Sequence, residues 1–90
     1  MMNLSEVVEK ARREAGLLTK LPTSSVVGAK KDGDSWSVTI ELVEKKSIPD
    51  SMDVLGIYEV KLDEKGEVTG LERKGLRKRG DTEERRGRGL

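Results

Sequence analysis

The segment SWSVTIELVEKKSIPDSMDVLGIYEVKLDEKGEVTGL, residues 35–71, decides the fold. Apolar residues occupy every second position from Trp36 to Leu42, and this alternation predicts a half-buried strand over residues 35–45. A second apolar run predicts a strand over residues 54–62, which the turn residues 63–66 then end. Short turns of this kind join neighbouring strands in antiparallel order, so the segment is the centre of an antiparallel sheet.

The flanking residues add a helix and two outer strands. Asn3, with Glu6 three residues later, forms a capping-box pattern and predicts a helix from about Leu4 to Ala15. We expect Gly16 to end this helix, and Pro22 forbids its continuation. Helical spacing places six apolar residues on one face of this helix: Leu4, Val7, Val8, Ala11, Ala15 and Leu18.

A weak strand is expected over residues 24–30 and a last, increasingly basic strand over residues 68–76. The prediction is therefore a two-layer α+β domain, residues 1–79, with the N-terminal helix packed on an antiparallel sheet of about four strands. Residues 80–90 have no apolar pattern, and we expect them to form a flexible charged tail.

The composition of the 90-residue chain removes several kinds of chemistry. It contains neither cysteine nor histidine, so it lacks thiol nucleophiles, disulfides and the commonest general base. Its glycines form no phosphate-binding motif, and no apolar stretch is long enough to cross a membrane. We therefore expect no catalytic, cofactor or metal site, no enzymatic activity, and a cytoplasmic location.

Charge is distributed unevenly along the chain. Residues 1–71 contain 10 Lys/Arg and 13 Asp/Glu, whereas residues 72–90 contain 8 and 4. The basic segment has three interpretations: an edge strand protected by charge, a surface that docks an acidic protein, or a nucleic-acid contact. The scarcity of aromatic residues, one Trp and one Tyr, disfavours nucleic acid, because single-strand binders stack bases on exposed rings.

The connection between the two central strands is the other candidate surface. Asp50 and Asp53 have no calcium-loop spacing and fit turn capping better than metal binding. Trp36 is expected in the core, and Tyr58 is expected half in the core and half at an interface. The candidate partner-binding residues are Ile48, Pro49, Asp50, Met52, Asp53, Tyr58, Glu59, Arg73, Arg77 and Arg79.

Three blocks of this chain resemble the gas vesicle protein O family: Trp36–Glu44, Ile48–Val60 and Leu62–Glu67. The middle block is the most specific, because its residue order is not required by strand patterning. Gly56 departs from the family, in which alanine is more usual at this position.

The resemblance implies a non-enzymatic accessory protein of gas vesicle assembly, chaperone-like or a minor vesicle component, without cofactors. Its implied partners are other gas vesicle proteins, shell and accessory, and its implied location is the cytoplasm, in association with vesicles. Open sheet edges leave a homodimer as an option. The alternative function is a regulator of gas vesicle gene expression that contacts nucleic acid through the basic C-terminal segment.

Overall fold

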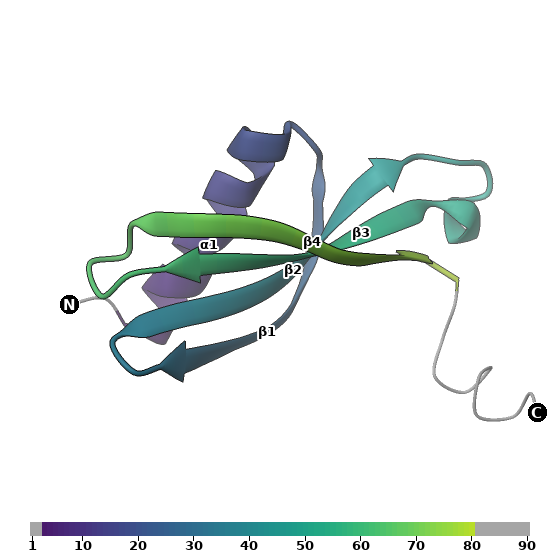
Figure 1. Cartoon of the computed structure of the whole chain (residues 1–90). Coiled ribbons are helices and arrows are strands. Elements are labelled where there is room, and N and C mark those ends of the chain that lie inside the picture. Colours follow the sequence, from purple (N-terminus) through teal and green to yellow (C-terminus); the bar gives the residue numbers. More distant parts are fainter. Residues whose placement is uncertain (1–2, 81–90) are drawn as a thin grey trace, which may run out of the picture.

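The computed structural model describes residues 3–80 and has one helix on one face of an antiparallel sheet (Figure 1). The strands follow one another in the order β1-β2-β3-β4, each paired with the next. The elements are α1 Leu4–Thr19, β1 Thr23–Asp32, β2 Ser35–Lys45, the short 3-10 helix η1 Asp50–Met52, β3 Val54–Leu62 and β4 Val68–Lys78. The predicted two-layer α+β class is thus confirmed.

Helix α1 begins as its sequence predicts. The backbone N–H of Glu6 donates to Asn3 Oδ1 at 2.8 Å, and the N–H of Asn3 donates back to Glu6 Oε1 at 3.0 Å. This reciprocal capping box satisfies two N–H groups that the first turn would otherwise leave unpaired.

The prediction that Gly16 ends α1 is wrong, because the helix continues to Thr19. Lys20 takes the left-handed C-cap conformation, with φ 62°, and its N–H donates to the Gly16 carbonyl at 2.8 Å. A helix tolerates an interior glycine at a cost of only about 1 kcal/mol, so a glycine alone does not stop it. Pro22 is the residue that makes further helix impossible.

The core lies between the middle of α1 and the centre of the sheet. Val7, Ala11 and Ala15 recur at four-residue spacing and are completely buried. Their sheet partners in the core are Val38, Ile40, Leu42, Val60 and Leu62. Trp36 and Tyr58 are partly buried against this cluster, with Lys31 Nζ 5.3 Å from the centre of the Trp36 ring.

The two ends of the expected apolar helix face lie outside the core. Leu4 is 51% exposed and Leu18 is 57% exposed, so the sheet covers only the middle of this face. The sheet makes contact mainly with the central turns, where small alanine side chains allow the helix to approach closely.

The central strands have the predicted limits, whereas β1 and β4 are each two or three residues longer than expected. Gly33, with φ 64°, and Gly66, with φ 85°, make the two hairpin turns possible. Leu55 is completely buried although it points away from the helix-side core, and its register partner is Val43. Strand β3 therefore has buried apolar residues on both of its faces.

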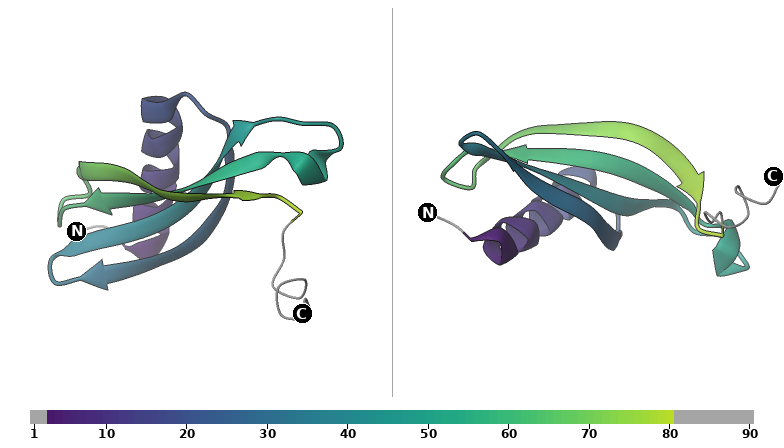
Figure 2. Two further views of the ribbon diagram at one scale, coloured as in Figure 1. Left: turned by 45° about the vertical axis from the view of Figure 1, so that its right-hand side comes forward. Right: turned by 90° about the horizontal axis from the view of Figure 1, so that it is seen from below.

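Several register shifts interrupt the pairing of the strands. They leave single residues without a register partner: Ser24 and Val27 in β1, Glu44 in β2, Thr69 and Lys74 in β4. Bulges of this kind bend strands and increase their twist. Figure 2 shows the result, an arched sheet with α1 under one end.

The other end of the sheet extends well beyond the helix. It consists of the last residues of β2, the first residues of β3, the end of β4, and η1 (Figures 1 and 2). The long dimension of the molecule, 43 Å against 28 and 19 Å, reflects this projection. The tail predicted for residues 80–90 lies outside the described residues except for Gly80.

Replacing Gly16 by alanine is expected to stabilise the protein by about 0.5–1 kcal/mol, because alanine is the better helix former. The added Cβ would lie 3.6 Å from Thr23 Cγ2 and 3.7 Å from the Leu21 carbonyl oxygen, which are ordinary contacts. Urea unfolding measures the change. Gly33→Ala is the control and should destabilise, since alanine is strained at φ 64°. A Gly16→Ala variant less stable than the parent would contradict this account of the helix.

Candidate functional site

The structure brings the two predicted surface segments together at the projecting end of the sheet. Residues 46–53, here called the distal loop, fold against the end of β4. The N–H of Arg79 donates to the Asp53 carbonyl at 2.9 Å, and the N–H of Gly80 donates to the Ser51 carbonyl at 2.9 Å. Loop and basic strand therefore form one continuous surface rather than two.

Asp53 holds this surface together. Its side chain is completely buried and accepts hydrogen bonds from the Ser47 N–H at 2.7 Å, Lys46 Nζ at 3.2 Å and Arg79 Nε at 3.2 Å. The Ser47 N–H, then the two cations, keep the pKa of Asp53 below its ordinary value, although burial opposes this. Asp53 is thus a charged anchor of the loop, and a partner cannot touch its carboxylate while the loop is in place.

The other predicted loop residues are available at the surface. Ile48, which precedes Pro49 through a cis peptide bond, is 98% exposed, and Met52 is 44% exposed. Pro49 and Asp50 are also exposed, and Asp50 lies 3.8 Å from Lys46 Nζ. The distal loop therefore has an exposed apolar tip, formed by Ile48, Pro49 and Met52, and Asp53 holds its backbone in place.

Each of the three candidate arginines faces an acidic group of the chain itself. Arg73 Nη1 lies 3.5 Å from Glu44, and Arg79 Nη2 lies 3.1 Å from Asp53. Arg77 binds Glu41 through two hydrogen bonds, Nε–Oε2 at 2.6 Å and Nη2–Oε1 at 3.0 Å. The positive charge of the basic strand is therefore largely compensated within the domain.

Sequence reasoning missed Glu41 and Glu44 as partners of these arginines. Glu41 is only 5% exposed, on the sheet face opposite α1, and Arg77 lowers its pKa, with a further hydrogen bond from Ser25 Oγ. Alternation along β2 places the Glu41 side chain on the sheet face opposite the one that carries Ile40 and Leu42. It does not identify Arg77, which is 36 residues away.

Tyr58 and Glu59 point to opposite faces of β3, so the candidate residues do not form a single patch. The Tyr58 hydroxyl donates to Glu44 Oε2 at 2.6 Å, and burial, then this carboxylate, raises the pKa of Tyr58. Glu59 accepts a hydrogen bond from Ser37 Oγ, which is the main cause of its lowered pKa, and lies 3.5 Å from Lys74 Nζ.

Two further properties limit the chemistry of the described chain. Within residues 3–80, no three Asp, Glu, His or Cys side chains gather as metal ligands would. Neither α1 nor η1 is long and apolar enough to cross a membrane. The fold and the site together define a small two-layer α+β protein whose outstanding feature is a projecting, ion-paired sheet end with an exposed apolar tip.

The chain belongs to the gas vesicle synthesis protein GvpO family, whose model matches residues 1–83. The match covers the whole described domain, and it confirms the resemblance seen in the sequence.

Curated relatives agree with the family model. The chain is 36% identical over 84 residues to gas vesicle protein O of Haloferax mediterranei and 35% identical over 81 residues to gas vesicle protein O1 of Halobacterium salinarum. These alignments cover 92% and 90% of the chain, but 60% and 68% of the relatives. Gas vesicle protein O of a Streptomyces species is 34% identical over 67 residues, 74% of the chain and 52% of the relative. No solved structure matches the chain.

Asp53→Asn is expected to weaken the attachment of the distal loop. It should also make the stability of the protein depend less on pH under acidic conditions. The pKa of Asp53 is lowered in the folded state, so its carboxylate stabilises the protein above the unfolded-state pKa, about pH 4. This stabilisation is lost as the pH falls below that value. The difference in Tm between parent and variant should therefore be largest near neutral pH and shrink below about pH 4. Asp50→Asn, at an exposed carboxylate, is the control; an equal effect of both variants would contradict the anchoring role.

Gly56→Ala is expected to break the Tyr58–Glu44 hydrogen bond at a cost of about 1 kcal/mol. The new Cβ would collide with the Glu44 carboxylate and approach Tyr58 Cε1 to 2.7 Å. Displacing Glu44 should lower the pKa of Tyr58 toward its ordinary value, because that carboxylate raises it. Tyr58 is the single tyrosine, so phenolate absorbance follows it directly. Gly75→Ala, where a Cβ meets no atom within 4 Å, should change nothing. An unchanged Tyr58 pKa in Gly56→Ala would refute the close packing.

Proposed function

We propose that the protein is a non-enzymatic accessory factor of gas vesicle assembly that binds other gas vesicle proteins through the distal loop. The observation that carries the proposal is the family match over residues 1–83, which includes every element of the domain. In this role the protein works in the cytoplasm, as a chaperone-like factor or a minor vesicle component, and in contact with vesicles.

The geometry of the distal loop supports a binding role. Burying a side chain such as Ile48 in a partner would contribute about 1.5–3 kcal/mol, because it is 98% exposed in the free protein. The hydrogen bonds of Asp53 already fix the loop backbone, so binding need not order it. Lys46 and Asp50 beside the tip add charges of both signs for orientation.

No specific observation favours the nucleic-acid alternative. Arg73, Arg77 and Arg79 each face a carboxylate, which reduces the positive potential available for phosphate. Neither aromatic ring is presented as an open stacking platform, because Trp36 and Tyr58 are both partly buried against the core.

The test uses a host whose gas vesicle cluster lacks this gene, complemented with variants of the full chain. Ile48→Asp should reduce vesicle formation to the level of the deletion, since a charge at the tip cannot enter an apolar pocket. Val27→Asp is the matched control, because Val27 is also an exposed aliphatic residue, 59% exposed, but lies on β1. Circular dichroism establishes that both variants are folded. Full vesicle formation with Ile48→Asp would refute the binding role of the distal loop. Normal vesicle formation in the deletion host would refute the accessory function.

A further inference from the structure

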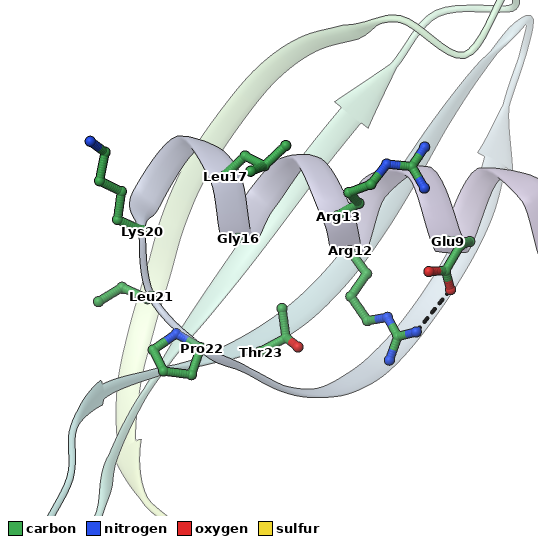
Figure 3. A pocket seen from close by; sticks show the side chains of 9 residues that line it. All are labelled: Glu9, Arg12, Arg13, Gly16, Leu17, Lys20, Leu21, Pro22 and Thr23. Carbon is green, nitrogen blue, oxygen red and sulfur yellow. Dashed lines mark hydrogen bonds and ion pairs between the residues drawn. The ribbon is translucent and has the colours of Figure 1, made fainter.

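A second surface lies on the outer side of α1, away from the distal loop. It is an open groove between the second half of the helix and the connection to β1 (Figure 3). Gly16 lies at its centre, Leu17 and Arg13 form one wall, and Pro22 and Thr23 form the other. Lys20 and Leu21 close one end, and the Arg12–Glu9 ion pair, 2.8 Å long, closes the other.

Glycine at position 16 is required neither to end the helix nor to allow close packing. The helix continues past it, and a Cβ at this position would meet Thr23 Cγ2 at an ordinary 3.6 Å. Glycine here costs helix stability relative to alanine. Its structural effect is to leave the floor of the groove open, where any side chain would fill the space between α1 and Thr23.

The walls combine apolar surface with uncompensated positive charge. Leu17 is 64% exposed, and Pro22 is exposed beside the half-buried Leu21. Arg12 is neutralised by Glu9, whereas Arg13 and Lys20 have no ion-pair partner within residues 3–80. The groove therefore combines apolar walls and an open floor with two net positive charges, unlike the distal surface, where acids compensate the arginines.

We propose that this groove binds a short acidic amphipathic segment of a partner protein. An aliphatic side chain of that segment lies over Gly16, between Leu17 and Pro22, and flanking carboxylates pair with Arg13 and Lys20. Charge complementarity selects this occupant, because a basic segment or a second copy of the same cationic groove would be repelled. The identity of the partner as another gas vesicle protein rests on the proposed function. The binding of an acidic amphipathic segment rests only on the residues of the groove.

The test is an NMR titration of the full chain with a synthetic peptide of alternating leucine and glutamate pairs. The expected result is a shift of the amide signals of Arg13, Gly16, Leu17 and Lys20 that weakens with added salt. The matched probe, with lysine in place of glutamate, should cause no such shift. Equal binding of both peptides, shifts confined to the distal loop, or no binding of the acidic peptide would overturn the proposal. Signals of the groove that depend on protein concentration alone would indicate a second copy instead and would also overturn it.

Variants separate the two determinants of the groove. Arg13→Glu combined with Lys20→Glu should weaken binding of the acidic peptide roughly ten-fold or more, whereas Lys30→Glu combined with Lys65→Glu, the same charge change outside the groove, should weaken it much less. Gly16→Gln places a helix-compatible side chain on the floor and should abolish binding without unfolding the protein. Retained affinity in Gly16→Gln would refute the role of the open floor.

Complementation distinguishes failure of this proposal from failure of the proposed function. If the groove acts in assembly, Arg13→Glu with Lys20→Glu should lose vesicle formation while Lys30→Glu with Lys65→Glu keeps it. Normal vesicles with the groove variant but not with Ile48→Asp would overturn a role of the groove in assembly and leave the proposed function standing. If deletion of the gene causes no defect, the accessory function fails, and the peptide titration still decides the groove.

Discussion

The structure depends on covering a long sheet with a single short helix. A strand of 11 residues spans about 36 Å, whereas a helix with its side chains is about 10–12 Å across. Because α1 crosses the strands, it covers one end of one sheet face, and its buried contact consists of a valine and two alanines. The remainder of the sheet must therefore be held together by something other than a second apolar layer.

Charged side chains supply that second set of interactions. Three carboxylates each bind one arginine in or just after the sheet's last strand. Glu44 binds Arg73 and Glu41 binds Arg77, both in β4, and Asp53 binds Arg79, which follows β4. A buried ion pair adds little net stability compared with a well-packed apolar pair, but an unpaired buried charge is very costly. The pairs made by the buried Glu41 and Asp53 consequently fix the position of the end of β4 relative to β2 and β3 more than they raise stability. The half-exposed Arg73, 3.5 Å from Glu44, adds little. The ordered distal loop is the visible result.

The sequence is most informative where one physical rule applies alone. Alternation of apolar residues predicts the limits of β2, a second apolar run ended by turn residues predicts those of β3, and the capping box predicts the start of α1. The end of α1 was predicted wrongly because Gly16 is both a common helix stop and a tolerated interior residue. The partners of the basic strand could not be predicted at all. Alternation assigns Glu41 to a face, but its pairing with Arg77 depends on the register of three strands and on bulges that carry no sequence signal.

The bulges also decide how the sheet meets other chains. Both outer strands have open hydrogen-bonding edges, yet β1 is interrupted at Ser24 and Val27, and β4 is interrupted at Thr69 and Lys74. A foreign strand needs an unbroken row of backbone donors and acceptors to extend a sheet. Here each edge strand offers only short uninterrupted rows of backbone donors and acceptors, and on β4 charged side chains flank these rows. The bulges therefore disfavour extension of the sheet by a further strand at either edge, so that the four strands set the width of the sheet.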